Sequence, residues 1–298
     1  MNSQKFFICA LLMMSFFLQV KSQDLLSLIE DDKDAKTEKD YTIATFKTTR
    51  IINMHTLESV GPRTLDFRIS HRFGPVNTGS YNAWGIDGPA NIRLSLEYSF
   101  DGRFMFGLGR SSYEKMVDGF VKYRLVRQTT DNKTPLSVTM FASMYYNALK
   151  DVNAASNGFD KFNPSTNRYS YAYQAIIGRK FSPSFSFQIA PWMVHYNLVE
   201  KSSDDNDMFG VAGMFRYKFS KRSAITMEYA YRFPGYSDKK YYDSMGIGYE
   251  IETGGHVFQI HFVNSFGLVE NQFLPFTDTQ WNDAGIRLGF NVSRVFTL

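Results

Sequence analysis

The chain has 298 residues, of which 44% are hydrophobic, 16% aromatic and 21% charged, with a formal net charge of +4. This hydrophobic content excludes a mainly disordered chain, because disorder needs low hydrophobicity and a high net charge. After residue 20 no stretch reaches the roughly 20 apolar residues of a membrane-spanning helix, which excludes a polytopic helical membrane protein. The small net charge gives no overall signal for nucleic acid.

The first 22 residues have the pattern of a secretory signal peptide. Lys5 precedes an apolar run from Phe6 to Leu18, and Val20 and Ser22 occupy the −3 and −1 positions of a cleavage site after Ser22. The alternative is a membrane anchor, but the apolar run is short for a span. Cys9, the single cysteine, lies in this segment. The mature chain would therefore have no disulfide, thiolate metal site or cysteine nucleophile.

Residues 23–40 are rich in acids and lysines, which predicts a solvated tether in the periplasm. Residues 41–298 are expected to form the folded domain. Within it, Thr42–Ile52 is too apolar for a free linker but alternates poorly. A short strand, a segment that enters the lumen of a barrel and a periplasmic cap are the three placements that fit.

From residue 64 onwards apolar and polar residues alternate with a period of two, which indicates strands with one apolar and one polar face. In residues 90–100, for example, Leu94 and Leu96 alternate with Arg93, Ser95 and Glu97. Twelve segments have this pattern: 64–73, 90–100, 103–110, 116–127, 136–146, 169–181, 185–197, 209–219, 224–233, 243–251, 256–264 and 284–298. Most are long enough for a tilted strand of about 9–11 residues to cross a bilayer.

The connections between these segments alternate between long and short, and Asp101-Gly102 is typical of a tight hairpin. An antiparallel up-and-down transmembrane β-barrel has this asymmetry, with short periplasmic turns and long outer loops. We therefore predict an all-β barrel of about twelve strands in the outer membrane, with ten or fourteen as alternatives. An even strand count places both termini in the periplasm. A soluble β-sandwich is the other fold that the strands allow.

The C-terminal segment and the aromatic residues agree with this prediction. Residues 286–298 form an alternating strand of the kind that the outer-membrane insertion machinery reads, although the chain ends in Leu298 instead of an aromatic residue. Tyr98, Phe100, Phe181 and Phe219 lie at strand ends, where aromatic rings favour the interface with outer-membrane lipid.

Three motifs together resemble a known family: residues 44–53 (ATFKTTRIIN), residues 65–74 (LDFRISHRFG) and residues 84–87 (WGID). They are similar to those of an uncharacterised family of membrane-bound β-barrels, a domain of unknown function from Bacteroidota-type bacteria. The resemblance covers residues 41–298. It implies an outer-membrane barrel, and it supplies no activity, ligand or catalytic residue.

The polar parity of the strands is expected to face the lumen. The lumen-lining candidates are Arg68, Arg72, Arg93, Glu97, Lys122, Arg124, Arg216, Glu228, Arg232, Glu250 and Arg287. One interpretation is that they form ion pairs that fill and stiffen the barrel, with Glu97 as the local counter-charge of Arg68 and Arg93. The other is a narrow passive channel that prefers small anionic solutes, because basic residues outnumber acidic ones.

Two further function classes stay open. An outer-membrane hydrolase similar to a lipase needs a serine beside a histidine that a third group holds. The histidines are His55, His71, His195, His256 and His261, and His71 is the best candidate because its parity places it near lipid. A surface-binding barrel would use its long outer loops. No motif indicates a cofactor or a metal site, and we predict a non-enzymatic protein that functions as a passive channel or in envelope structure.

Overall fold

The fold comes from a computed structural model that describes residues 40–151, 160–234 and 241–298. The predicted signal peptide and all of the acidic tether except Asp40 lie outside the described residues. Within the described ranges no helix is long and apolar enough to cross a membrane.

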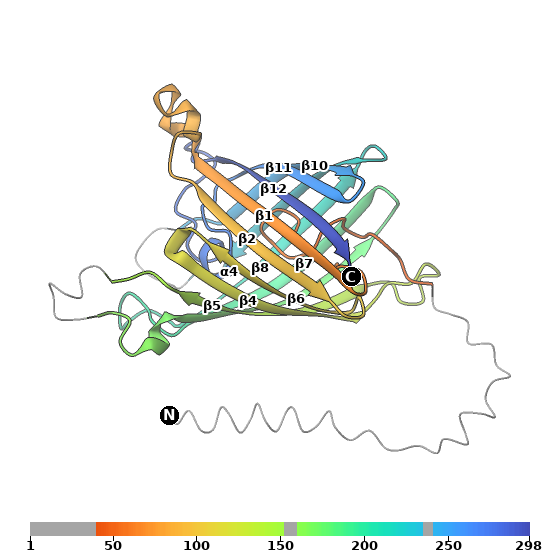
Figure 1. Ribbon diagram of the computed structural model, residues 1–298, viewed down its shortest axis with the longest axis horizontal. Helices are drawn as coiled ribbons and strands as arrows, with labels where there is room; N and C mark the ends of the chain where they lie inside the picture. Colours follow the sequence, from red (N-terminus) through yellow and green to blue (C-terminus); the bar gives the residue numbers. More distant parts are fainter. Residues whose placement is uncertain (1–39, 152–159, 235–240) are drawn as a thin grey trace, which may run out of the picture. The chain divides into compact units, whose positions relative to one another are not determined.

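Twelve strands form one closed barrel in which each strand pairs antiparallel with its neighbours in sequence and β1 pairs with β12 (Figure 1). The strands are β1 Thr64–Pro75, β2 Asn91–Ser99, β3 Phe104–Ser111, β4 Met116–Val126, β5 Ser137–Asn147, β6 Tyr169–Lys180, β7 Phe185–Tyr196, β8 Asp207–Lys218, β9 Ser223–Arg232, β10 Ser244–Thr253, β11 His256–Val263 and β12 Arg287–Thr297. The predicted up-and-down barrel is confirmed. Because the ring closes, no strand edge is left unpaired.

In residues 40–151, 160–234 and 241–298, helical structure is limited to short pieces in the connections. They are η1 Val76–Thr78, η2 Ser80–Gly85, η3 Tyr113–Lys115, η4 Ser165–Arg168 and α4 Glu270–Phe273. Among these, α4 has all four of its residues buried. Burial of a polar helix indicates that its connection folds into the barrel.

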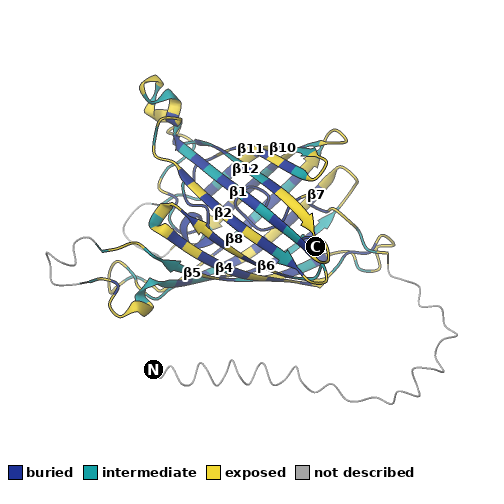
Figure 2. Ribbon diagram, viewed as in Figure 1, coloured by how far each residue is buried: buried dark blue, intermediate teal, exposed yellow. Residues whose placement is uncertain are grey.

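Burial alternates along the strands, with the polar face inside (Figure 2). On β2, Arg93 and Glu97 are buried, whereas Leu94 and Leu96 are 47% and 50% exposed. A protein in water does the reverse, because apolar surface is removed from water on folding. The apolar outer wall therefore fits a lipid surround.

The two ends of the barrel differ in their connections. Residues 100–103, 181–184, 219–222 and 254–255 form tight turns at one end, which we call the turn end. Residues 76–90, 197–206 and 264–286 belong to the longer connections at the opposite end, the loop end. This confirms the predicted alternation of short and long connections, with the two exceptions that the sequence also indicates: the short connection 112–115 at the loop end and the longer connection 127–136 at the turn end.

The turn between β2 and β3 is longer than the two-residue hairpin that Asp101-Gly102 predicts, because four residues separate the strands. Asp101 Oδ1 accepts hydrogen bonds from the backbone N–H groups of Phe104 at 2.7 Å and Arg103 at 2.8 Å. These bonds hold the pKa of Asp101 below its usual value. Gly102 has a φ of +76°, which a residue with a side chain rarely adopts.

Aromatic rings cluster on the outer wall close to the turn end. The ring of Phe100 lies 5.0 Å from that of Tyr98 and 5.7 Å from that of Phe106. Further round the barrel, Phe219 and Tyr249 are 5.9 Å apart. Such a belt marks the interface between the apolar core of a bilayer and its headgroups.

The lipid-facing wall can be tested with Leu96→Arg. The outward side chain at this position lies near the middle of β2, so an arginine there should cost about 2–4 kcal/mol of folding free energy in lipid. The measurement is urea unfolding in lipid vesicles, followed by the mobility shift between boiled and unboiled samples on a gel. Asp87→Arg in the exposed connection 76–90 is the matched control and should change stability little. Equal stability of the two variants would contradict the assignment of the outer wall.

Candidate functional site

The lumen is occupied by residues 45–57, which we call the plug segment. All residues from 48 to 57 are buried, and Met54, His55 and Leu57 have no exposed surface. The segment folds back on itself, since Ile51 N donates to Met54 O and Thr56 N donates to Thr49 O, both at 2.9 Å. Of the three placements that the sequence allowed, the structure shows the segment that enters the lumen.

A second segment enters from the loop end. It is the first part of the β11–β12 connection, residues 264–274, which includes α4 and which we call the loop insert. Arg50 of the plug segment donates to Glu270 of the loop insert at 3.0 Å. Asn53 Nδ2 donates to Ser265 Oγ, also at 3.0 Å. The two inserted segments therefore meet inside the barrel.

Side chains of the wall satisfy the backbone of the plug segment. The carboxylate of Glu228 accepts hydrogen bonds from the N–H groups of Asn53 and Met54 at 3.0–3.1 Å. Gln188 accepts from Leu57 N at 3.0 Å and donates to His55 O at 2.9 Å. Backbone at this depth cannot rely on bulk water, so these bonds allow an irregular segment to lie there.

Two more wall amides act in the same way. Gln259 donates to the carbonyl oxygen of Ile51 at 2.9 Å, and Asn291 donates to that of Ile52 at 2.8 Å. Apart from the isolated bridges at Tyr41–Thr129 and within the segment itself, residues 40–60 make no strand pairing. The plug segment is thus held by side chains and stays separate from the hydrogen-bonded ring of strands.

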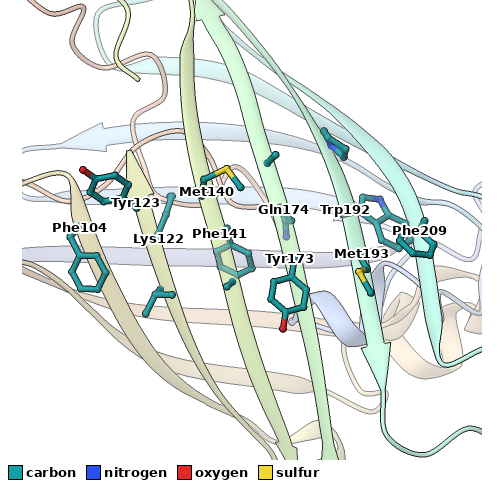
Figure 3. Close-up of a pocket in the computed structure, with 14 residues that line it drawn as sticks. Phe104, Lys122, Tyr123, Met140, Phe141, Tyr173, Gln174, Trp192, Met193 and Phe209 are labelled. Atoms are coloured by element: carbon teal, nitrogen blue, oxygen red, sulfur yellow. The ribbon is translucent and has the colours of Figure 1, made fainter. Parts of the chain in front are cut away.

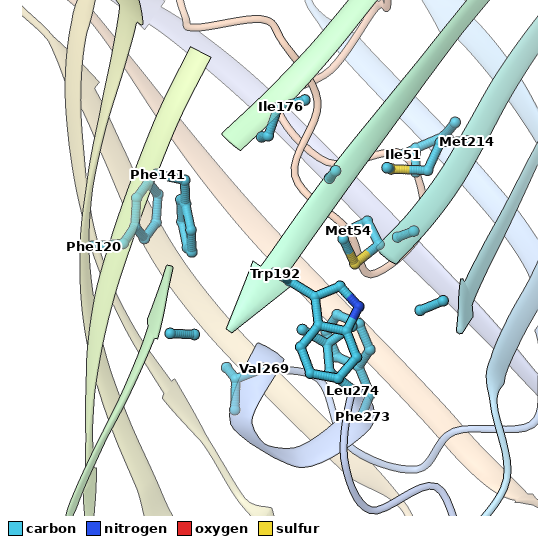
Figure 4. Packing of buried hydrophobic residues seen from close by; sticks show 14 of the residues in the cluster. Ile51, Met54, Phe120, Phe141, Ile176, Trp192, Met214, Val269, Phe273 and Leu274 are labelled. Atoms are coloured by element: carbon cyan, nitrogen blue, oxygen red, sulfur yellow. The ribbon is translucent and has the colours of Figure 1, made fainter. Parts of the chain in front are cut away.

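One side of the lumen is apolar. Ile51 and Met54 of the plug segment lie among wall residues that include Trp192 and Met214, and Val269 and Leu274 of the loop insert extend the cluster (Figure 4). Burial of this apolar surface away from water favours the position of the plug segment inside the barrel. The polar groups described next occupy the remainder of the lumen.

Arg68 lies at the centre of a network on β1 and β2. Its Nη2 donates to Asp66 at 3.1 Å and to Thr49 of the plug segment at 2.9 Å. Thr49 Oγ1 in turn donates to Glu97 at 2.5 Å, and Glu97 lies 3.9 Å from Arg68 Nε. Arg68 and Glu97 are therefore partners, in keeping with the predicted role of Glu97 for this arginine.

The predicted role of Glu97 for Arg93 is corrected. Arg93 Nε and Nη2 instead donate to the two oxygens of Asp118 at 2.9 Å and 2.5 Å. Asp118 lies on β4, two strands away, and Gly109 on β3 is between them. A Cβ at Gly109 would meet the Arg93 guanidinium at 2.3 Å. The absence of a side chain at this glycine makes the pair geometrically possible.

The remaining candidates of the inner wall also have partners. Lys122 donates to the carbonyl oxygen of Glu58 at 2.5 Å and lies 3.4 Å from that of Thr49. Arg72 donates to Asn53 Oδ1 at 2.7 Å. The ion pairs of the other wall arginines are Arg124–Glu58 at 3.3 Å, Arg216–Glu250 at 2.8 Å and Arg216–Glu252 at 2.9 Å. Cations and acids of the lumen therefore hold one another and the inserted segments.

Two predicted lumen residues lie near the loop end. Arg232, the last residue of β9, is half-buried beside Tyr241, whose ring centroid is 5.8 Å from the guanidinium carbon. Arg287, the first residue of β12, is 3.9 Å from Asp278 and 4.7 Å from the ring of Phe266. Both belong to the rim, and the structure does not bring them into the central network.

The sequence did not identify Arg50, Glu58 and Glu270 as lumen residues. A usable signal was the apolar pattern around Glu270, since Leu268, Val269 and Phe273 are unusual in a solvated outer connection. For Arg50 the signal was the apolar character of residues 42–52. These three residues are partners of charged groups in the lumen, and the alternation of the strands does not identify them.

The five histidines give no hydrolase site in the described part of the chain. His71 stacks on Phe290 at 5.1 Å, and no hydrogen bond joins any of the five histidines to a serine in residues 40–151, 160–234 and 241–298. His195 pairs with Asp207 at 2.6 Å beside the ring of Tyr171, 6.2 Å away. An acid–base pair without a serine does not complete the nucleophile arrangement. Within the same ranges no group of three or more His, Cys, Asp or Glu side chains could hold a metal ion.

The outer wall carries an apolar groove of about 480 Å³ (Figure 3). Outward side chains of successive strands border it, among them Tyr123, Met140, Tyr173 and Met193. Small residues at Ala142 and Ala175 leave the space between them. The lining suits lipid acyl chains and offers no acid, base or nucleophile on the outer side.

The pair across β3 can be tested with Gly109→Ala. The new methyl group would overlap the Arg93 guanidinium and should destabilise the barrel by about 1–3 kcal/mol. Gly213→Ala on β8 is the control, since the nearest atom to its new Cβ is 3.9 Å away. The readout is the urea midpoint in lipid vesicles. A lower urea midpoint in both variants, or in neither, would contradict the proposed steric overlap between a side chain at position 109 and Arg93.

The hold of the wall on the plug segment can be tested with Glu228→Ala. The change leaves the N–H groups of Asn53 and Met54 without their acceptor, which should cost about 1–3 kcal/mol. In a Met54→Cys background, thiol modification should accelerate by about tenfold, because 1.4 kcal/mol corresponds to a factor of ten. Glu228→Gln, which keeps one acceptor oxygen, should give a smaller increase. An exposed control, Asp131→Ala in the same Met54→Cys background, should give no increase. A fast rate in the protein that carries Met54→Cys alone would show that the plug segment is outside the lumen.

Solved structures that resemble this chain include porins and an enzyme, each with low sequence identity. A NanC porin has 11% identity and a TM-score of 0.48, with 78% of this chain and 99% of that chain covered. The KdgM porin in complex with disordered oligogalacturonate has 11% identity and a TM-score of 0.47, with the same coverage of 78% and 99%. Outer membrane phospholipase A from Escherichia coli has 10% identity and a TM-score of 0.45, with 82% and 95% covered. Similarity at this level carries no function to this chain.

No curated protein matches the chain. A family model does: "Membrane bound beta barrel domain (DUF5777)" matches residues 46–296, which takes in most of the plug segment and all strands except the end of β12. This confirms the resemblance to a membrane-bound barrel family of unknown function, while the origin in Bacteroidota-type bacteria stays a prediction. The chain belongs to the DUF5777 family of membrane-bound β-barrel domains.

Proposed function

We propose that the chain is a non-enzymatic outer-membrane channel that its own plug segment closes at rest. Small solutes pass only when residues 45–57 leave the lumen. The observation that carries this proposal is the filled lumen, in which wall side chains bond to the backbone of the plug segment. An open passive pore would have a wet lumen instead.

The charged wall favours a channel over a purely structural barrel. Buried ion pairs stabilise a protein less than well-packed apolar residues do, so a lumen that is always dry gains little from them. Yet Arg68, Arg93 and Lys122 are each at most 1% exposed on the inner wall. Charges on this wall are useful in a second state in which water and solutes replace the plug segment.

The connectivity allows the plug segment to leave without breaking the barrel. The twelve strands close the ring by themselves through the β1–β12 pairing. Residues 40–44 join the segment at the turn end, where Tyr41 bridges to Thr129. In this proposal the turn end and both termini face the periplasm, the signal peptide at 1–22 directs export, and residues 23–40 are a periplasmic tether.

Removal of the plug segment would leave an excess of positive charge. Among the described strand residues, six buried cations face five buried acids on the inner wall, and Arg287 adds a seventh buried cation at the rim: Arg68, Arg72, Arg93, Lys122, Arg124 and Arg216 against Asp66, Glu97, Asp118, Glu228 and Glu250. Rings of basic residues favour anions in pores. The proposed solutes are therefore small anions.

A second candidate function is an envelope-structural role for a permanently closed barrel. The apolar cluster around Met54 and Trp192 favours it, because such packing resembles the core of a stable domain (Figure 4). The two functions differ in whether removal of the plug segment leads to conductance.

Conductance in planar lipid bilayers tests the channel. The whole mature protein should be closed for most of the recording, whereas a variant that lacks residues 41–57 should give stable conductance steps. The mobility shift of unboiled protein verifies that the variant folds. Glu228→Ala, which keeps the full chain, should raise the open fraction if the deletion does not fold. Steady conductance in the unmodified protein, or a folded and silent deletion variant, would refute the proposal, and the latter would favour the structural role.

Lys122→Glu tests the charge of the opened wall. Lys122 bonds to the carbonyl oxygens of Thr49 in the plug segment and of Glu58 directly after it, so departure of the plug segment removes the Thr49 contact and opens the ammonium group to the lumen. In the plug-deleted background the substitution should move ion preference towards cations, seen as a shift of the reversal potential in a salt gradient. Lys133→Glu in the exposed connection between β4 and β5 should shift it far less. No shift with Lys122→Glu would mean that ions take another route.

A further inference from the structure

A cavity of about 550 Å³ lies at the loop end and is separate from the groove on the outer wall. Its lining comes from four connections, with Glu114 of η3, Arg168 of η4, Leu198 between β7 and β8, and Gln272 of α4 among the contributing residues. The size falls in the range of about 300–1,000 Å³ that is usual for small-molecule sites. We call this cavity the outer vestibule.

The loop insert provides two buried amides that line this cavity. Asn271 and Gln272 are 2% and 6% exposed, and both line the outer vestibule. The nitrogen of each is bonded, from Asn271 Nδ2 to Ser170 Oγ at 2.9 Å and from Gln272 Nε2 to Glu114 at 3.0 Å. The oxygens, Asn271 Oδ1 and Gln272 Oε1, are buried without a hydrogen-bond partner. A buried acceptor without a donor is unfavourable, so a ligand that supplies donors would satisfy both oxygens.

The position of these amides is fixed by their neighbours. The backbone carbonyl oxygen of Asn271 accepts a hydrogen bond from the hydroxyl of Tyr196 on β7. Glu270, the preceding residue, accepts from Tyr145 on β5 at 2.7 Å and from Arg50 of the plug segment. These bonds hold α4, which carries both amides, beside the cavity before any ligand arrives, and this lowers the entropic cost of binding.

Aromatic rings form the sides of the vestibule. Tyr113 and Phe266 lie with their ring centroids 5.1 Å apart, and Tyr196 and Phe276 lie 5.3 Å apart. On the η4 side the ring of Phe162 is also part of the lining. Such rings offer flat apolar faces with large contact areas. A ligand that fits must therefore present both an apolar face and hydrogen-bond donors.

The charges of the lining exclude a simple ion as the favoured ligand. Lys161 and Arg168 both lie over the ring of Phe162, at 4.9 Å and 4.0 Å, and Arg168 also donates to the carbonyl oxygens of Asn147 and Leu149. Carboxylates also line the vestibule, at Glu114, Glu200 and Asp278. Because the lining carries both positive and negative groups, a small anion or cation would be attracted by some of them and repelled by others.

We propose that the outer vestibule binds a short neutral oligosaccharide. A pyranose ring has an apolar face that packs on aromatic rings, and its hydroxyl groups donate to Asn271 Oδ1 and Gln272 Oε1, which are buried in the empty vestibule and are reached when the two amides turn towards the ligand. The hydroxyl oxygens also accept bonds, which suits the Lys161 ammonium group. Binding here needs no opened lumen, so the proposal stands or falls independently of the channel.

The test is direct binding of neutral oligosaccharides to the whole mature protein in detergent. A glycan array that holds neutral, acidic and amino oligosaccharides identifies a probe, and titration calorimetry with that probe gives the affinity. The double variant Asn271→Leu with Gln272→Leu keeps side-chain volume and removes both acceptors. It should weaken binding by about tenfold or more, since each lost hydrogen bond contributes about 0.5–1.5 kcal/mol.

Two further variants separate recognition from folding. Asn271→Asp keeps an acceptor oxygen and should retain most of the affinity. Phe181→Ala removes an aromatic ring at the turn end and should leave binding unchanged. If the double variant does not fold, Phe162→Ala takes its place and should lose binding. Absence of binding to any neutral oligosaccharide, binding confined to charged glycans, or unchanged affinity in the folded double variant would each overturn the proposal.

Discussion

A charged group inside this barrel must find its partner inside the barrel, and most of the lumen follows from that requirement. Burial without a partner costs several kcal/mol for an ion, so the inner wall is possible only with paired groups or water. Arg93 meets Asp118 across Gly109, and Arg68 meets Asp66 and Glu97. The wall alone carries more cations than acids. Glu58, directly after the plug segment, and Glu270 of the loop insert supply further acids, and they pair with Arg124 of the wall and Arg50 of the plug segment.

The same requirement explains how an irregular segment can lie at the depth of the membrane. Strands satisfy their backbone through the ladder, but residues 45–57 have no ladder to join. Amide and carboxylate side chains of the wall take its place, which ties the geometry of the plug segment to particular residues such as Glu228 and Gln259. Apolar packing on the opposite side of the lumen adds energy without direction. Closure therefore combines directional hydrogen bonds with non-directional apolar packing.

Sequence alone predicts the barrel well and the lumen poorly, for physical reasons. Alternation along a strand is local, so residues such as Arg93 and Leu96 reveal their faces without any structure. The pairing of charged side chains is not local. Arg93 reaches Asp118 because a glycine on the intervening strand leaves room, and the alternation pattern of the sequence does not predict this contact. The plug segment has no period at all, since wall side chains shape it. The connection around Glu270 is an exception. Its apolar residues predict that this part of the connection is buried, because a connection exposed to water is usually polar.

Amide hydrogen exchange of the whole mature protein in lipid vesicles tests the closed lumen most directly. The N–H groups of Asn53, Met54 and Leu57 are bonded to wall side chains and buried, so peptides that cover residues 48–57 should exchange far more slowly than an unstructured segment does. Protection close to that of strands such as β8 is the result that this account predicts. Exchange of residues 48–57 at the rate of a free chain, in a barrel whose strands stay protected, would contradict it.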